Sequence, residues 1–405
     1  MKARGFPANK ICVPGGFSFS AACAGLKASG RPDLALVEAC PGTTAAALFT
    51  KNRVVAAPLV VGRASLAASR GRVRAVIVNS GNANCATGKP GIKACQHVCR
   101  ALSDLLNVSA SQVFPSSTGI IGVPLPVDNI ISRLPALVAA REATPRGMAD
   151  FAQAIMTTDT RPKLAGAEFR SEKATVKLLG IAKGAGMIHP QLATMLVYLF
   201  TDVAAAPAEL KTVLRDACDE SFNCISIDGD TSTNDTVLLL ASGRSGVPLK
   251  NSPAREKFST VLHQMCQSLA EQIVSDGEGV RHVIRLAIEQ ARNSEEARRV
   301  ARTVAGSLLV KTAWAGADPN WGRILAAVGR SGVAINPSGI SIMIGDQVVC
   351  RGGVACGFDE QQAHRVLACP SSEIRIRLRR GRSSAVFLTT DLTAEYVRIN
   401  ADYST

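Results

Sequence analysis

Residues 183–202 read KGAGMIHPQLATMLVYLFTD, a polar segment with two glycines that runs into an apolar one. The apolar part, Met195 to Phe200, has the length and the β-branched and aromatic content of a buried strand. Gly184 and Gly186 permit backbone angles that other residues avoid. They follow Lys183, a cation that can hold a carboxylate or lower a neighbouring pKa. The stretch therefore predicts a polar loop that leads into a central strand.

This stretch has two ordinary interpretations, a dinucleotide-binding loop and a plain strand start. A dinucleotide-binding loop is excluded, because the third glycine of GxGxxG would fall on His189. Thr194 opens the apolar run, and taken alone it is a common β-branched strand residue. The stretch by itself therefore assigns no chemistry to Thr194.

Outward from this stretch, strand-like and helix-like segments alternate. Strands are predicted at 75–78, 175–179 and 195–200, and short β-branched runs follow Gly332. Helices are predicted at 92–106, from an N-cap at Asp128, and at 207–218, 255–273 and 294–310. The fold class is therefore mixed α/β (α+β). At 405 residues the chain suggests two or three units of ~150 residues, although no linker marks a boundary.

Composition indicates a soluble globular protein, since 47% of residues are hydrophobic and 19% charged. No secretory h-region or spanning run of ~20 apolar residues occurs, which favours a cytoplasmic location. The twelve cysteines are scattered without a CxxC, so most are expected to be buried. Cys95, His97 and Cys99 fall on the helix at 92–106, where the cysteines continue the apolar stripe. Packing is favoured there, and no metal site is predicted.

The net charge of +14 makes a basic nucleic-acid-binding protein an outside alternative. The densest basic segment, IRIRLRRGR at 374–382, alternates apolar residues with arginines, which indicates a half-buried strand with a solvated face. Aromatic residues make up only 4%, too few for base-stacking platforms. Anionic small-molecule substrates suit the charge equally well.

Seven polar or glycine-rich blocks of the sequence, taken together, point to one protein family. They resemble, in order and over nearly the whole chain, the blocks of the ornithine acetyltransferase (glutamate N-acetyltransferase) family: NSGNANCATG (79–88), PSSTGIIG (115–122), MTTDT (156–160), KGAGMIHPQLATML (183–196), SIDGDTSTND (226–235), LVKTAWAGADPNWGRILAAVG (309–329) and INADYST (399–405). The resemblance implies an ornithine acetyltransferase-like fold with an N-terminal threonine nucleophile at the start of a central strand.

The family relation further implies that the precursor cuts itself between Ala193 and Thr194. The products are an α chain, residues 1–193, and a β chain, residues 194–405. The threonine hydroxyl can attack the preceding carbonyl, and water then releases a β chain whose first residue carries a free amine. Because that amine has a pKa of ~7.7–8.0, it can serve as the base for its own hydroxyl.

The resemblance also assigns the remaining site residues. Thr118 and Gly119, placed in a turn between Ser117 and Gly122, match the oxyanion pair. Lys183 is expected to hold a substrate carboxylate and Glu278 the ornithine ammonium group. The complete set of implied substrate contacts is Thr157, Lys183, Thr194, Glu278, Asn400 and Thr405.

The implied reaction is a ping-pong transfer of acetyl from N2-acetylornithine through Thr194 to glutamate, in arginine biosynthesis. Acetyl-CoA is an additional candidate donor, no cofactor or metal is expected, and the expected assembly is α2β2 from one precursor, without nucleic-acid or membrane partners. An N-terminal-nucleophile amidohydrolase, with water as acceptor, is the alternative.

Two further motifs are interpreted as structural. SIDGDTSTND has Asp228, Asp230 and Ser232 at EF-hand-like spacing, but a calcium loop needs Gly at the sixth position and Glu at the twelfth. Those positions hold Thr233 and Leu239. A site-shaping polar loop is therefore predicted, and Trp314, Trp321 and Arg323 are expected to pack near a helix start without a catalytic role.

Overall fold

Two β-sheets face each other at the centre of the molecule. The structure is a computed structural model that describes residues 11–172, 174–189, 195–250 and 253–402. The first sheet has the order β1-β2-β4-β5, from strands Phe17–Ala22, Leu34–Ala39, Ala75–Asn82 and Val113–Ile120. The second has the order β3-β9-β8-β7-β6, from Thr44–Phe49, Thr236–Ala241, Leu196–Thr201, Thr175–Lys183 and Lys163–Arg170.

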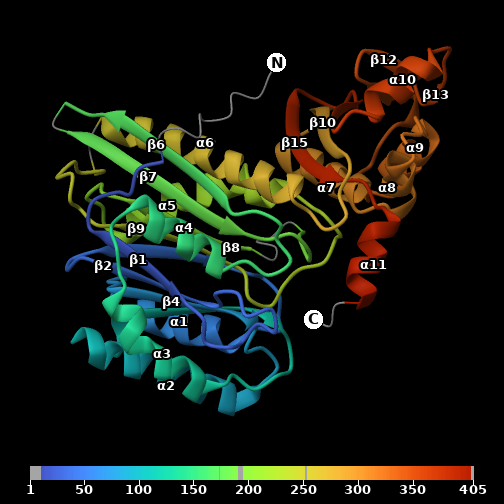
Figure 1. Cartoon of the computed structure of the whole chain (residues 1–405). Helices are drawn as coiled ribbons and strands as arrows, with labels where there is room; N and C mark the ends of the chain where they lie inside the picture. The colour runs from blue at the N-terminus through green and yellow to red at the C-terminus, as the bar shows by residue number, and fades with distance from the viewer. Residues whose placement is uncertain (1–10, 173, 190–194, 251–252, 403–405) are drawn as a thin grey trace.

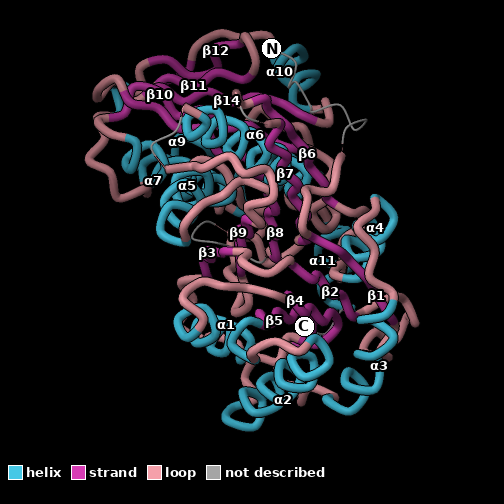
Figure 2. The backbone as a smooth tube through the Cα atoms, turned by 90° about the vertical axis from the view of Figure 1, so that its left-hand side faces the viewer, coloured by secondary structure: helices cyan, strands magenta, loops and turns pink. Residues whose placement is uncertain are grey.

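Helices cover the outer faces of both sheets, which gives a helix–sheet–sheet–helix sandwich (Figure 1). The first sheet is covered by α1 (Ala57–Ala68), α2 (Gly88–Leu106) and α3 (Val127–Ala139). The second is covered by α5 (Pro207–Asp219) and α6 (Ala254–Ser275), and α4 (Pro145–Ala154) packs beside β1. Figure 2 shows α1, α2 and α3 at one end of the molecule and β10, β11 and β14 at the other.

The predicted strand at 195–200 explains why the sandwich forms. β8 is buried at every position, and its residues alternate between two cores. Tyr198 and Phe200 point into the core between the sheets, whereas Val197 and Leu199 pack under α5 and α6. A strand buried on both faces is largely apolar, as β8 is from Leu196 to Phe200.

A third sheet forms most of the C-terminal part. Its order is β13-β12-β11-β14-β10-β15, from Val354–Ala355, Gln347–Arg351, Ser341–Ile344, Ser371–Arg377, Val283–Ala291 and Ser383–Thr390. The helices of this part are α7 (Ser294–Ala305), α8 (Leu308–Ala315), α9 (Trp321–Gly329), α10 (Glu360–Leu367) and the terminal α11 (Ala394–Asp402). The arginine-rich segment is β14, with Ile374 and Ile376 buried, as the alternation predicts.

Some predicted boundaries were wrong. The helix expected over 294–310 is two helices, because Gly306 ends α7 and α8 starts after Ser307. Asp128 lies in the first turn of α3, and the N-cap is Pro126. The strand at 75–78 continues to Asn82, because parallel pairing with β5 carries it into the polar block. Cys95 and Cys99 are buried on α2, as expected for packing.

Candidate active site

Strand ends and loops from both halves of the chain meet at one edge of the second sheet. β7 ends at Lys183 and β8 begins at Leu196, and these two residues are paired in the antiparallel register. β9 runs parallel to β8 and pairs Thr236 with Leu196. The glycine-rich segment after Lys183 and the loop before Thr236 therefore lie side by side.

A cavity of about 70 Å³ opens at this edge. Its wall contains every predicted oxyanion and substrate residue that the structure describes: Thr118, Gly119, Thr157, Lys183, Glu278 and Asn400. The other lining residues are not among the predicted oxyanion or substrate contacts, although three of them belong to the predicted site-shaping loop: Ala83, Ile121, Thr158, Gly186, Met187, Ser232, Thr233 and Asn234. Residues from six separate family-like blocks thus meet in one place.

Thr118 and Gly119 lie at the end of strand β5, so the predicted turn was wrong. β5 runs parallel to β4 and sets Gly119 opposite Gly81. Gly119 has φ +131°, and a Cβ there would lie 2.3 Å from the Gly81 carbonyl carbon. Only glycine satisfies both the backbone angle and the close approach. The two polar blocks at 79–88 and 115–122 therefore form neighbouring strand ends.

Lys183 is the buried cation of the cavity. Its side chain is 4% exposed, and its Nζ donates to Thr157 Oγ1 at 2.7 Å and to Thr118 Oγ1 at 3.3 Å. Burial lowers the pKa of Lys183, while the Asp159 carboxylate opposes the shift. A desolvated cation beside two hydroxyl groups can attract an anionic substrate group strongly.

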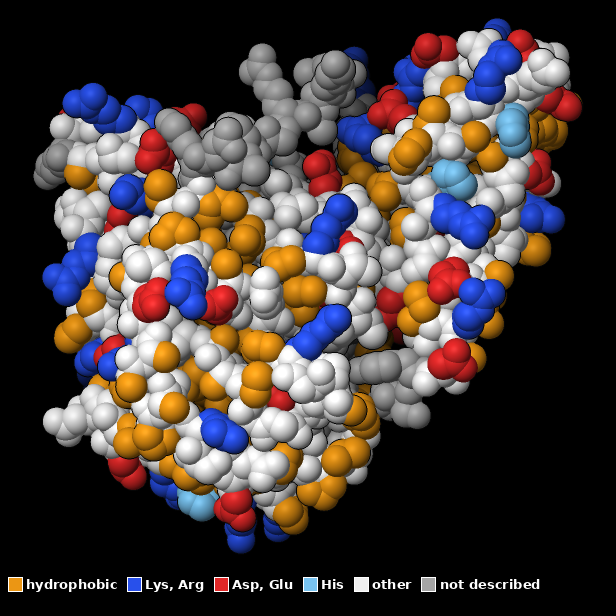
Figure 3. All heavy atoms as spheres, in the orientation of Figure 1, with side chains coloured by type: hydrophobic (Ala, Val, Ile, Leu, Met, Phe, Trp, Pro, Cys, Tyr) orange, Lys and Arg blue, Asp and Glu red, His pale blue; other side chains and the backbone are white. Residues whose placement is uncertain are grey.

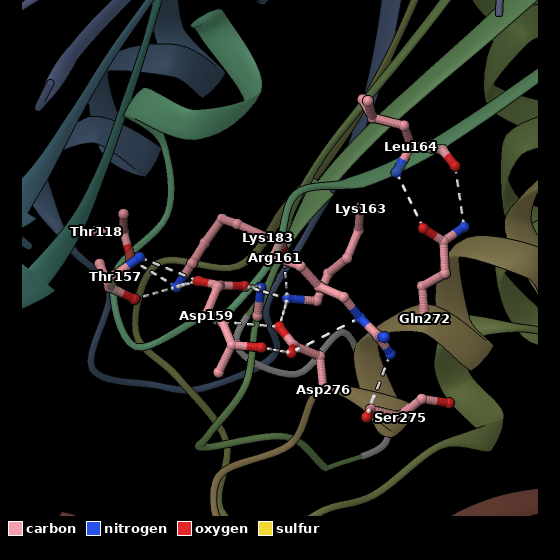
Figure 4. A network of polar contacts seen from close by, with 12 residues as sticks. Thr118, Thr157, Asp159, Arg161, Lys163, Leu164, Lys183, Gln272, Ser275 and Asp276 are labelled. Carbon is pink, nitrogen blue, oxygen red and sulfur yellow. Dashed lines mark hydrogen bonds and ion pairs between the residues drawn. The ribbon is translucent and has the colours of Figure 1, made fainter. Parts of the chain in front are cut away.

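Behind the cavity lies a buried ionic network that sequence analysis missed (Figure 4). Lys163 Nζ contacts Asp159 Oδ1 and Asp276 Oδ2, each at 2.6 Å. Asp159 also accepts from the Gly184 amide at 2.6 Å and lies 3.8 Å from Lys183 Nζ. Although burial opposes ionisation, Lys183 and Lys163 lower the pKa of Asp159 to about 2. Asp159 therefore connects the lysine of the cavity to the start of the glycine-rich segment.

Replacing Asp159 with asparagine is expected to destabilise the protein by about 3–5 kcal/mol near neutral pH, because the buried Lys183 loses its carboxylate partner and the buried Lys163 keeps only Asp276. The depressed pKa means that the stabilisation is present above pH ~4 and is lost as pH falls towards 2. The measurement is the denaturant midpoint between pH 3 and 7. The matched control is Asp150→Asn, whose exposed carboxylate lies 4.0 Å from Arg146. Equally small shifts of the denaturant midpoint in Asp159→Asn and Asp150→Asn would contradict a stabilising role of the buried network.

Glu278 and Asn400 close the other side of the cavity. Asn400 Nδ2, on α11, donates to Glu278 Oε2 at 2.8 Å. The backbone amide of Glu278 donates to the Ala185 carbonyl at 2.9 Å. Gly186 leaves room for the carboxylate, since a Cβ there would lie 2.4 Å from Glu278 Oε2. The second glycine of the KGAG segment thus lets Glu278 reach the cavity.

The polar loop 226–235 holds both flanks of the segment in which the cut is predicted. Asp228 accepts from the Met187 amide and, at 2.9 Å, from the Ile188 amide. On the other flank, Asp235 Oδ1 accepts from the Met195 amide at 3.0 Å. Burial raises the pKa of Asp228 to about 6 and raises that of Asp235 as well. The prediction of a site-shaping loop is confirmed, and its carboxylates bind backbone amides.

Three predicted site residues, Ala193, Thr194 and Thr405, lie outside the described residues. The nearest described neighbours of the predicted cut are His189 and Met195. His189 Nδ1 is 3.1 Å from Ser226 Oγ, so this flank is also attached to loop 226–235.

Comparison with known proteins gives the same family as the sequence blocks. The ArgJ family model matches residues 18–405. The chain belongs to the ArgJ family. The arginine biosynthesis bifunctional protein ArgJ of Methylococcus capsulatus is 43% identical over 98% of this chain and 97% of its own length. The protein of the same name from Symbiobacterium thermophilum is 42% identical over 98% of this chain and 99% of its own length. Membership confirms the predicted enzyme class, an acyltransferase of arginine biosynthesis.

Solved ArgJ-family structures also match. The Bacillus halodurans arginine biosynthesis bifunctional protein argJ is 39% identical, with a TM-score of 0.49, over 51% of this chain and 98% of that chain. The Mycobacterium tuberculosis ornithine acetyltransferase, complexed with ornithine, is 38% identical, with a TM-score of 0.38, over 44% and 92%.

Charged side chains of both signs occur on one face of the molecule. On the face shown in Figure 3, the coloured Lys and Arg side chains are scattered, with Asp and Glu between them. Among the described residues, no group of His, Cys, Asp and Glu is arranged to hold a metal ion. No helix in the described part of the chain is long and apolar enough to cross a membrane.

Proposed function

We propose that this ArgJ-family enzyme cuts itself between Ala193 and Thr194 and then carries acetyl on Thr194. The support is the position of Met195, the next residue. Its amide is bound by Asp235, and it directly precedes β8 at the edge where the cavity opens. The observation that carries the proposal is that Thr118, Gly119, Thr157, Lys183, Glu278 and Asn400 all line that one cavity.

In the cut, the Thr194 hydroxyl attacks the Ala193 carbonyl, the C–N bond breaks, and the nitrogen leaves as the α-amine. Water hydrolyses the resulting ester and releases two chains, residues 1–193 and 194–405. One sheet then contains strands from both chains. The first chain supplies β3, β6 and β7, and the second chain supplies β8 and β9. The two chains would therefore stay interleaved after cleavage.

In the transfer, the Thr194 hydroxyl loses its proton to its own amine and attacks the acetyl carbonyl of N2-acetylornithine. The Thr118–Gly119 strand end stabilises the oxyanion, and ornithine leaves with the proton. Glutamate then takes the acetyl group by the reverse steps. Lys183 is the partner for a substrate carboxylate, and Glu278 with Asn400 is the partner for the ornithine ammonium group.

Product analysis tests the proposal. Purified protein incubated with N2-acetylornithine and glutamate should form N-acetylglutamate and ornithine in equal amounts. Release of free acetate at the same rate with and without glutamate would instead indicate an N-terminal-nucleophile amidohydrolase. Acetyl-CoA as a second donor, the α2β2 assembly and the cytoplasmic location belong to the same proposal.

Asp235→Ala is expected to slow self-cleavage at least tenfold, because the Met195 amide loses its acceptor next to the scissile bond. Asp235→Asn should cut at close to the wild-type rate, since the oxygen of the new side-chain amide can still accept from the Met195 amide. The measurement is the precursor fraction over time on denaturing gels. Fast cleavage of the alanine variant would contradict the role of this contact.

A further inference from the structure

A second, larger cavity of about 790 Å³ adjoins the catalytic cavity and shares Thr157 with it. It is formed by the loop between β1 and β2, the ends of β4 and β5, and the segment after α4. Because Thr157 Oγ1 accepts from Lys183 Nζ, the shared residue also touches the central cation of the site. We call this larger cavity the carrier pocket.

The loop that forms one wall of the carrier pocket is rigidly held. Asp33 is fully buried, and its carboxylate accepts from the amides of Ala24 and Leu26, each at 2.6 Å, and of Lys27 at 3.1 Å. The Leu26 carbonyl packs on Gly81, where a Cβ would lie only 2.8 Å from it. A buried carboxylate with three amide donors fixes the loop next to the strand ends of the active site.

The lining of the carrier pocket is cationic. Lys27 and the exposed Arg31 come from this loop. Lys27 Nζ donates to the Pro32 carbonyl at 2.8 Å and to the Ala154 carbonyl at 3.0 Å, which fixes its position. Burial lowers the pKa of Lys27 to about 8, so most of it is protonated at neutral pH. Asp159, the carboxylate of this lining, is engaged by Lys163 and Lys183.

Size decides what each cavity can take. The catalytic cavity, at about 70 Å³, has less than a tenth of the volume of the carrier pocket. A nucleotide-bearing acyl carrier does not fit there. At about 790 Å³, the carrier pocket is within the range of cavities that enclose large ligands.

We infer that the carrier pocket binds the phosphate-bearing carrier of a thioester acyl donor, with the phosphates near Lys27 and Arg31 and the thioester end at Thr157. The inference rests on the proposed function, because it supplies the second acetyl donor with a binding site. In that reaction the Thr194 oxygen bonds to the acetyl carbon and the C–S bond breaks. The carrier leaves as a thiol with the proton of the hydroxyl.

The test compares two ligands and two charge reversals by calorimetric titration of the purified protein. Coenzyme A should bind at least tenfold more tightly than pantetheine, which lacks the phosphates. Arg31→Glu should remove most of that difference, and Arg100→Glu, an exposed arginine on α2 outside both cavities, should keep it. The second pocket variant is Lys27→Gln, which retains a donor for the Pro32 carbonyl. It should also reduce the difference in affinity between coenzyme A and pantetheine.

Kinetics separate this inference from the proposed function. Arg31→Glu should lower the ratio of kcat/KM for acetyl-CoA to that for N2-acetylornithine at least tenfold. An unchanged ratio, or equal affinity of the wild type for coenzyme A and pantetheine, would overturn the carrier pocket while leaving acetylornithine transfer in place. Failure of the wild type to use acetylornithine would instead count against the proposed function. The comparison of coenzyme A with pantetheine binding would still show whether the carrier pocket recognises the phosphates.

Discussion

Replacing Thr194 with alanine is expected to leave the precursor whole and to lower acetyl transfer by at least ~10⁴-fold. One residue supplies both the hydroxyl that attacks and, after the cut, the amine that activates it, so a single change removes both functions. The measurement is intact mass of the purified protein together with the rate of N-acetylglutamate formation. The wild type should give two chains and the variant one chain of 42.4 kDa.

Thr194→Ser is the conservative companion, and it should still cut and transfer acetyl at a reduced rate. A second control is Thr201→Ala at the far end of β8, which changes a buried threonine outside the cavity. It should cut normally. A split Thr194→Ala protein, or an uncut variant with full activity, would contradict the assignment of the nucleophile.

Gly119→Ala is expected to lower kcat by about 10²–10³-fold, the usual cost of losing an oxyanion donor. The added Cβ would meet the backbone of Gly81 at 2.3 Å, and φ is +131°, so the ends of β4 and β5 must move apart. KM should change less than kcat, because the displaced groups act on the developing charge.

Gly122→Ala is the matched control for this prediction. Gly122 lies in the same PSSTGIIG block and also has a positive φ, +86°, but a Cβ there meets no atom within 4 Å. Its activity should stay within a few-fold of the wild type. The measurement is kcat and KM of the Gly119→Ala and Gly122→Ala variants from steady-state kinetics. Similar activities of the two would show that the close strand approach at Gly119 is not needed for catalysis.

The fold could be predicted where periodicity is strong. The all-apolar run at 195–200 became β8, buried on both faces, and the helices at 207–218 and 255–273 lie within a residue or two of α5 and α6. Boundaries failed where tertiary pairing overrides local composition. β4 extends into the polar block 79–82, because β5 lies parallel beside it.

The site residues came from the family resemblance, and the cavity unites those that the structure describes. What sequence analysis missed are the groups behind them. The Asp159–Lys163–Asp276 network and the amide contacts of Asp228 and Asp235 join segments more than 35 residues apart, except for the local Asp159–Lys163 pair. MTTDT contains Asp159, and SIDGDTSTND contains Asp228 and Asp235. Nothing in one sequence tells a buried, amide-binding carboxylate from a solvated one.

The central claim is that Thr194 carries the acetyl group. Peptide mass mapping of protein mixed with N2-acetylornithine, without glutamate, and quenched in acid tests it most directly. One acetyl group should appear on the peptide that begins at Thr194, and it should disappear when glutamate is added, with N-acetylglutamate formed in equal amount. Turnover with no acetylated Thr194, or with acetyl on another residue, would contradict the account.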